Sequence, residues 1–247
     1  MLSSHVHADF AAVTRASQVP ERFRYTDGYY EALGDPKGTV GILDRLRFHV
    51  VAQEVVGDSV LDIGAYHGDF LSLMRHRGLE EMHGTEVNPV RMRLANGRIG
   101  ARVVRIGFRH GELSDFRDDS VDTVVCMEVL EHVDDLKTAV DEILRVARRR
   151  VIITVPCSQK LSYELCIHCN RYTPVSGHLR AFHRDSLQRL FAGRLRAIRT
   201  RAIGHLGLMR SVRRLASVMP LSALAGLDWV ACTMARTGRW RLVVGDK

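Results

Sequence analysis

The chain has 247 residues, of which 46% are hydrophobic and 26% are charged. These are ordinary proportions for a globular protein, and the chain contains no internal repeat or low-complexity tract. Thirty-six Lys and Arg against 28 Asp and Glu give a net charge of +8, which would suit an anionic partner such as a nucleic acid. The arginines are spread along predicted helices as well as grouped, so a solvated surface is the favoured interpretation of this charge.

Location and redox state can be predicted from three features. Residues 1–13 have no basic segment followed by an apolar run, so no secretory signal is predicted and we expect a cytoplasmic protein. The most apolar stretch, residues 216–235, is interrupted by Pro220 and Asp228 and is too short to span a membrane. Five cysteines, an odd number in a reducing compartment, argue against a disulfide framework.

The first half of the chain alternates between strand-like and helix-like segments. Residues 1–40 are polar and aromatic and are predicted to form an N-terminal arm, whereas residues 41–247 are predicted to form one α/β domain. Apolar spacing predicts helices at residues 41–56, 69–77, 88–96 and 136–148, and strands at 59–63, 81–87, 101–106, 121–127 and 151–155. Such alternation indicates a parallel sheet with helical crossovers.

Residues 156–183 interrupt this rhythm with clustered Cys and His. The pattern then resumes, with a helix expected at residues 184–192, a strand near 196–203, a helical insertion at 207–236 and a closing strand at 239–244. The sequence therefore indicates one α/β domain carrying two insertions.

A ligand site is predicted at the end of the first strand. The segment VLDIGAYHGDF, residues 60–70, is a glycine-bearing turn that would let the backbone approach a ligand closely, although Tyr66 stands where a middle glycine is usual. Glu86, after the second strand, could accept both ribose hydroxyls, and Glu112 could accept from an adenine amino group. A tight turn without a ligand is the alternative interpretation.

Three segments together resemble the class I S-adenosylmethionine-dependent methyltransferases, especially their bacterial small-molecule branch. They are VLDIGAYHGDF, GTEV and GELSDFRDDSVDTVVCMEVLEHV. The resemblance covers residues 43–156 well. It implies a Rossmann-like, seven-stranded, mostly parallel sheet with helices on both faces and an antiparallel last strand. The spacing from Asp62 to Glu86 also suits an NAD-binding domain, but the glycine pattern and EVLEHV disfavour it.

Carried over by position, the resemblance implies which residues hold S-adenosylmethionine. The methionine and ribose part would lie against Asp62, Gly64, Ala65 and Gly68, with Tyr66 and Val87 beside it. Glu86 would hold the ribose, Glu112 and Leu113 the adenine, and Met127 and Glu128 the back of the pocket. Arg47 is a candidate for binding the cofactor carboxylate, and a surface role for this residue is the alternative.

Methyl transfer is an in-line displacement, so the protein mainly has to hold the acceptor atom about 3 Å from the methyl carbon. A general base is needed only where the acceptor keeps its proton until late in the reaction. His132, just past a strand end, is the predicted catalytic residue because neutral imidazole accepts protons near pH 7. Alternatively His132 braces its loop, and His67, His178 and His183 also stay open as candidates.

A structural zinc site is predicted in the interrupting segment. Cys166 and Cys169 form a CxxC pair, a spacing that lets two thiolates bind one tetrahedral zinc ion, and Cys157 and His178 could complete the set. CIHCNRYTPVSGHLRAF also resembles an insertion of some bacterial methyltransferases. His168 or His183 could substitute as a ligand, and a redox-active pair or unrelated thiols are the alternatives.

The expected function is methylation of a small molecule, for example a biosynthetic natural-product intermediate, at oxygen or nitrogen. The arm with Tyr25, Tyr29 and Tyr30 and the helices of residues 207–236 would shape the acceptor pocket. One alternative is an RNA or protein acceptor, which the positive charge favours. Another is a non-catalytic, zinc-stabilised binding protein. No membrane partner is expected.

Overall fold

A computed structural model describes residues 40–100, 113–157, 159–166, 170–183, 185–212, 214–216 and 218–247, and the backbone of 102–104. Nearly all of the predicted N-terminal arm, including its three tyrosines, lies outside these ranges. Glu112 and Cys169 also lie outside them.

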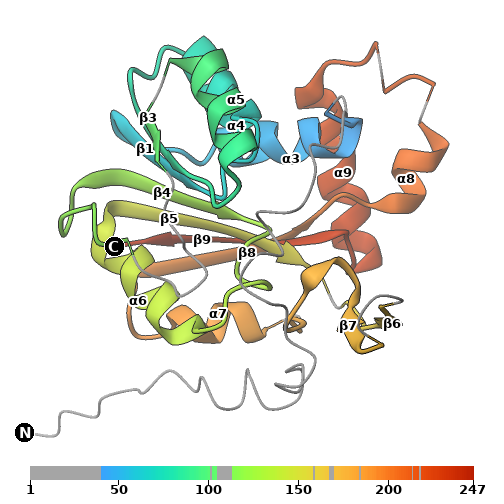
Figure 1. Cartoon of the computed structure of the whole chain (residues 1–247). Helices are drawn as coiled ribbons and strands as arrows, with labels where there is room; N and C mark the ends of the chain where they lie inside the picture. Colours follow the sequence, from blue (N-terminus) through green and yellow to red (C-terminus); the bar gives the residue numbers. More distant parts are fainter. Residues whose placement is uncertain are drawn as a thin grey trace, which may run out of the picture.

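A seven-stranded sheet forms the centre of the protein (Figure 1). Its spatial order is β3-β2-β1-β4-β5-β9-β8, with neighbours parallel from β3 through β5 and β9 antiparallel to both β5 and β8. The strands are β1 Ser59–Ile63, β2 Glu81–Thr85, β3 Arg102–Val104, β4 Val121–Met127, β5 Ala147–Pro156, β8 Ala197–Ile203 and β9 Trp240–Asp246. The predicted Rossmann-like sheet with an antiparallel last strand is thus confirmed.

Helices cover both faces of the sheet, as the alternating pattern predicts (Figure 1). On one face lie α6 (Leu136–Val146) and α7 (Ser186–Phe191). The opposite face is covered by α3 (Ile42–Ala52), α4 (Asp69–His76), α5 (Pro89–Ile99) and α9 (Leu221–Ala235), with α8 (Leu206–Ser211) nearby.

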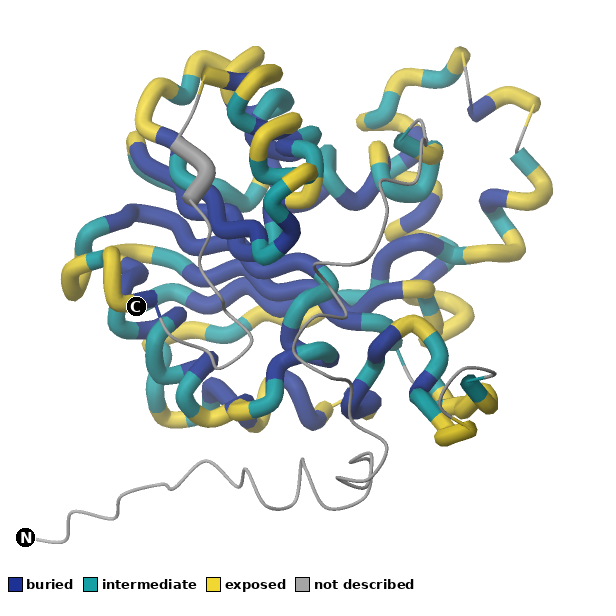
Figure 2. The backbone as a smooth tube through the Cα atoms, viewed as in Figure 1, coloured by how far each residue is buried: buried dark blue, intermediate teal, exposed yellow. Residues whose placement is uncertain are grey.

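Strand side chains alternate between two hydrophobic cores, as the two-residue period of a strand requires. Within β4, Val124 and Cys126 pack in the core under α6 and α7, whereas Val125 packs in the core under α3, α4 and α9. All residues of β1 and β4 are buried, and Figure 2 shows these strands as the dark centre of the molecule. Strands buried on both faces account for the β-branched runs in the sequence.

The junction of α6 and β5 differs from the prediction. The helix ends at Val146, not at residue 148, because Ala147 adopts extended backbone angles and begins a ten-residue strand. Arg148 and Arg149 lie at this strand start and form ion pairs with Asp122 at 3.2 and 3.0 Å. Apolar periodicity alone cannot locate this boundary, because the arginines are fixed by contacts with a distant segment.

The two insertions have different structures. Residues 156–183 contain the antiparallel hairpin β6 (Tyr163–Leu165) and β7 (Tyr172–Pro174), followed by the short helix η3 (Val175–Gly177). The hairpin extends from the body and is largely exposed (Figure 2). The predicted helical insertion corresponds to α8 and α9. None of the helices in the described part of the chain is both long enough and apolar enough to cross a membrane.

Candidate active site

The turn between β1 and α4 depends on glycine. Gly64 has φ +75°, and a Cβ there would lie 2.5 Å from the Val129 side chain. The amides of Gly64 and Ala65 both donate to the Thr85 carbonyl, at 3.0 and 2.8 Å. Gly64 therefore provides both the left-handed backbone and the close approach that bring the turn across the end of β2.

A cavity of about 420 Å³ opens beside this turn, at the carboxyl ends of β1 and β4. This edge of a parallel sheet is where α/β proteins bind ligands. Seven of the predicted cofactor residues line the cavity: Arg47, Asp62, Gly64, Ala65, Tyr66, Met127 and Glu128. It is also lined by residues that were not assigned to the cofactor, namely Val40, Asp44, Phe48, His67, Asp69 and Phe70.

Arg47 is the buried cation of the cavity, with 9% exposure. Its guanidinium donates to Asp44 at 3.0 Å and lies 3.7 Å from a Glu128 carboxylate oxygen. The guanidinium carbon also lies 4.5 Å from the centre of the Trp240 ring. The surface alternative for Arg47 is therefore wrong, because α3 turns this side chain into the site.

Two buried carboxyl groups share the cavity with Arg47. Burial raises the pKa of Asp62 to about 8; the Arg47 charge opposes this shift and the Glu86 charge adds to it. Burial likewise raises the pKa of Glu128 to about 7, against the charge of Arg47 and hydrogen bonds from Trp240 Nε1 (2.8 Å) and Thr154 Oγ1 (3.2 Å). Arg47 alone therefore does not compensate both carboxyl groups, and a cationic ligand would stabilise their ionised forms.

Tyr66 occupies the rim of the cavity. It has φ +52° and is 36% exposed, and its ring lies 4.4 Å from the Arg91 guanidinium carbon. Its amide donates to Glu86 Oε2 at 3.0 Å, and the Asn88 amide donates to Glu86 Oε1 at 2.8 Å. Buried Glu86 thus braces the β1–α4 turn.

Four predicted cofactor residues are not among those lining the cavity: Gly68, Glu86, Val87 and Leu113. Gly68 is the N-cap of α4, where a Cβ would lie 3.2 Å from Ala95 and Ile99 of α5. Leu113 is fully buried in the α6 core, and its amide donates to Glu142. The ribose and adenine roles of Glu86, Val87, Glu112 and Leu113 stay predictions.

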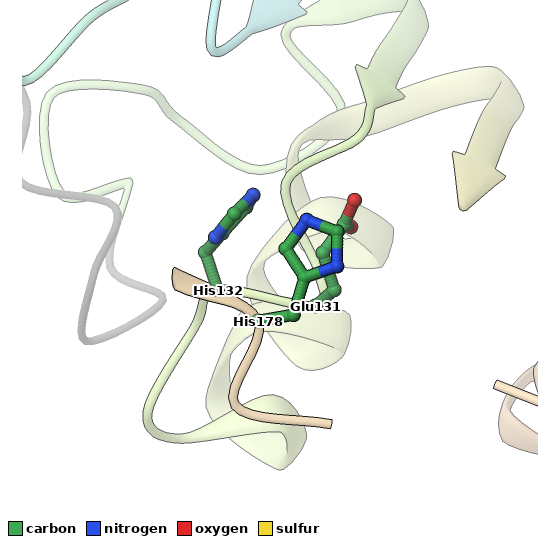
Figure 3. Close-up of side chains that lie close together, drawn as sticks. All are labelled: Glu131, His132 and His178. Carbon is green, nitrogen blue, oxygen red and sulfur yellow. The ribbon is translucent and has the colours of Figure 1, made fainter. Parts of the chain in front are cut away.

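The loop after β4 brings Glu131 and His132 to His178, which follows η3 (Figure 3). One ligand-type atom from each of the three residues lies within 4.8 Å of the other two. Burial and the neighbouring His178 lower the pKa of His132 to about 4, so the ring is neutral but a weak proton acceptor. Burial raises the pKa of Glu131; the Glu128 charge raises it further, and Arg47 lowers it.

The other two candidate histidines lie in different surroundings: His67 lines the cavity, and His183 is exposed. Glu131 is a site residue that the sequence prediction missed, although it lies inside EVLEHV. Its position three residues after Glu128, past the end of a buried strand, was the available signal.

Two of the predicted zinc-binding cysteines, Cys157 and Cys166, lie in different parts of the fold. Cys166 closes the β6–β7 turn, where its amide donates to the Arg171 carbonyl and its own carbonyl accepts from Asn170. Cys157 lies at the end of β5 with its sulfur 3.8 Å from Arg241 Nη2. The group of metal-type ligand atoms found among the described residues contains His178 but neither of these cysteines.

Comparison with known proteins gives a consistent result. Residues 61–155 match a family model described as a methyltransferase domain. An uncharacterized methyltransferase of Mycobacterium leprae (strain Br4923) is 28% identical over 232 residues, which are 92% of this chain and 78% of that protein.

Solved structures share the fold at low sequence identity. A SAM-dependent methyltransferase from Archaeoglobus fulgidus superimposes with a TM-score of 0.56 at 16% identity, over 83% of this chain and 93% of that one. Geranyl diphosphate C-methyltransferase from Streptomyces coelicolor A3(2), solved with Mg²⁺, geranyl diphosphate and S-adenosyl-L-homocysteine, gives 0.54 at 16% identity, over 87% and 85%. The chain therefore carries a methyltransferase domain at residues 61–155 and shares its fold with S-adenosylmethionine-dependent methyltransferases.

Proposed function

We propose that this methyltransferase acts on a small-molecule acceptor, at oxygen or nitrogen. The observation that carries the proposal is that arginines of the two Arg-rich segments, residues 148–150 and 194–201, are paired with carboxylates. Arg148 and Arg149 pair with Asp122, and Arg150 pairs with Asp246 at 2.6 Å. Arg199 and Arg201 pair with Glu54 at 3.0 and 3.5 Å. Arginines already paired with carboxylates are poorly suited to bind a phosphate backbone.

The residues around the cavity fit the cofactor. S-adenosylmethionine supplies an activated methyl group on a sulfonium sulfur, and it also carries an ammonium group and a carboxylate. Asp62 and Glu128 would favour the two cationic groups, and Arg47 would pair with the carboxylate. Each residue matches a charge of the cofactor.

His132 as general base is the weaker part of the proposal. The loop after β4 puts it four residues after the cavity-lining Glu128, where it would contact the acceptor. Its lowered pKa limits the driving force for proton transfer, so an acceptor with an easily lost proton fits better than one that needs strong base assistance.

A turnover assay tests the acceptor class. Purified protein is incubated with S-adenosylmethionine and a panel of phenols, alcohols and amines, and the formation of S-adenosylhomocysteine is measured. We expect turnover with members of the panel and none with the Asp62→Asn variant. Methylation of bulk RNA or protein but of no small molecule would contradict the proposal. An RNA affinity that falls steeply with added salt would support the RNA alternative.

We also retain the hypothesis of a structural zinc ion at the cysteine segment, with Cys166 at the β6–β7 turn as a ligand. A tight turn at a CxxC pair is typical of zinc sites. His178 is the least certain of the four predicted ligands, because it lies with Glu131 and His132. Metal analysis of Cys166→Ser tests this: zinc content unchanged by the substitution would contradict the cysteine site.

A further inference from the structure

Glu131, His132 and His178 come from two segments that are far apart in the sequence. Glu131 and His132 lie in the loop that leaves β4, and His178 follows η3 after the β6–β7 hairpin. Figure 3 shows the carboxylate and both imidazole rings gathered where the two segments meet. Ligand-type atoms of the three residues lie within 4.8 Å of one another, and the two ring centres are 4.7 Å apart in an edge-on arrangement.

The Glu131 carboxylate needs a positive partner. The residue is only 1% exposed, and neither oxygen has a hydrogen-bond partner among the described residues other than its own amide. A buried ionised carboxylate without a cation is costly, and such groups are normally paired or coordinate a metal. The unsatisfied oxygens belong to the same group of ligand-type atoms as the two imidazoles.

Both histidines are held in the tautomer that suits metal binding through Nε2. His132 Nδ1 donates to the Gly177 carbonyl at 3.0 Å, and His178 Nδ1 donates to the Gln159 side-chain oxygen. Because these oxygens are acceptors, each neutral ring carries its proton on Nδ1 and its lone pair on Nε2. Metal-binding histidines typically donate their second nitrogen to an oxygen in this way, which fixes the ring orientation.

The loop that carries two of the ligands is already ordered. Buried Arg180 donates to the carbonyls of Leu130 (2.7 Å), Val133 and Asp134 (3.1 Å). The Leu179 amide donates to the Glu131 carbonyl at 2.8 Å, which ties the His178 segment to the loop. The arrangement is therefore held by contacts that do not need the metal, as a preorganised site requires.

We propose that Glu131, His132 and His178 bind a divalent first-row transition metal ion such as Zn²⁺ or Fe²⁺. Two imidazoles and one carboxylate suit these ions, in contrast to Mg²⁺, which prefers oxygen ligands. Three protein ligands leave at least one coordination position open, as in catalytic metal sites. In this site His132 serves as a metal ligand in place of the general base. The cysteine zinc site would then take His168 or His183 in place of His178.

Cobalt(II) is the probe, because its visible absorption reports ligand type and geometry. The full-length chain is stripped with chelator and titrated with Co²⁺, then with Zn²⁺ by calorimetry. We expect one equivalent of Co²⁺ bound through nitrogen and oxygen ligands, and this equivalent should persist in Cys166→Ser, where a cysteine site would lose its thiolate-to-cobalt bands. Glu131→Gln and His132→Ala should each weaken binding at least tenfold. Cys166→Ser is the matched control and should bind normally.

Thermal melting of each variant with and without Zn²⁺ separates loss of binding from loss of folding. Glu131→Gln replaces the buried carboxyl group with a neutral amide of similar size, so the metal-free variant should melt no lower than wild type. Zn²⁺ should raise the melting temperature of wild type and of Cys166→Ser, but not of Glu131→Gln. The proposal is overturned if Cys166→Ser binds no Co²⁺ through nitrogen and oxygen ligands, or if the affinity is unchanged in Glu131→Gln.

Discussion

The two ends of strand β4 place buried carboxylates in opposite environments. At its start, Asp122 is 3% exposed and accepts from the Asp58 amide at 2.9 Å and the Ser59 hydroxyl at 3.3 Å, with two arginines paired to its other oxygen. Burial acts to raise its pKa, but these partners lower it overall. At the carboxyl end, Glu128 and the neighbouring Asp62 have raised pKa values.

This contrast distinguishes a structural carboxylate from the candidate functional ones. Asp122 is paired with two arginines within the chain and ties β1, β4 and β5 together. The negative charges of three other carboxylates are not fully compensated within the chain: those of Asp62, Glu128 and Glu131. Their ionisation lowers the stability of the fold unless a cation from outside the chain binds beside them. Groups with raised pKa values in a cleft mark functional sites for this reason. Each prediction below tests whether the two ends of the sheet differ in this way.

The largest effect is expected at the structural end. Asp122→Ala leaves the Asp58 amide and Ser59 hydroxyl without their acceptor and should lower the free energy of unfolding by about 2–4 kcal/mol. Urea unfolding measures this. Asp118→Ala is the control, since this exposed residue pairs with Arg145 and should change stability by less than about 0.5 kcal/mol. Equal effects of the two substitutions would remove the distinction.

The next largest effect is expected from Asp62→Asn, which should increase stability at high pH and weaken cofactor binding. The pKa of about 8 lies above the value in an unfolded chain, so the stability contributed by the protonated form is complete below about pH 4. It is lost as the pH rises through 8. Asp62→Asn should therefore be more stable than wild type at pH 9 and indistinguishable from it at pH 4.

The same variant should bind S-adenosylmethionine at least tenfold more weakly, measured by calorimetry. This loss removes about 1.4 kcal/mol of binding free energy. A variant that is more stable and also binds normally would show that Asp62 is not part of the cofactor site.

A smaller effect is expected in the pH dependence of cofactor binding by the wild type. A cationic ligand favours ionised Asp62, so affinity should increase between pH 6 and 8 and level off above pH 8, by up to about tenfold per pH unit. Calorimetry in buffers with different ionisation enthalpies should detect proton release below pH 8. In Asp62→Asn this component should disappear, which isolates it from titration of the cofactor itself.

The smallest effect is expected at the exposed arginines. Arg199 is 57% exposed in its ion pair with Glu54, so Arg199→Ala should change the free energy of unfolding by less than about 0.5 kcal/mol. It should also leave turnover of a small-molecule acceptor unchanged. A large loss of turnover would point to a role for this surface in binding an anionic acceptor.

Much of the fold was predictable because it depends on local patterns. Apolar periodicity located β1, β4, α4 and α6 to within two residues. The glycine turn and EVLEHV predicted which sheet edge carries the site. The start of β5 was missed because Arg148 and Arg149 are fixed by Asp122, 26 or more residues earlier in the chain. The role of Glu131 was missed because nothing adjacent to it identifies His178 as its neighbour.

The sequence by itself determined most of the secondary structure, the sheet edge that carries the cavity and the presence of Asp62, Arg47 and Glu128. These follow from residue type and short-range spacing, which act within one or two turns of the chain. Only the tertiary structure decided that Arg47 faces Glu128, that Asp122 is paired while Asp62 is not, and that His178 joins Glu131. Charge compensation depends on distances in space, and those distances are set by how distant segments pack.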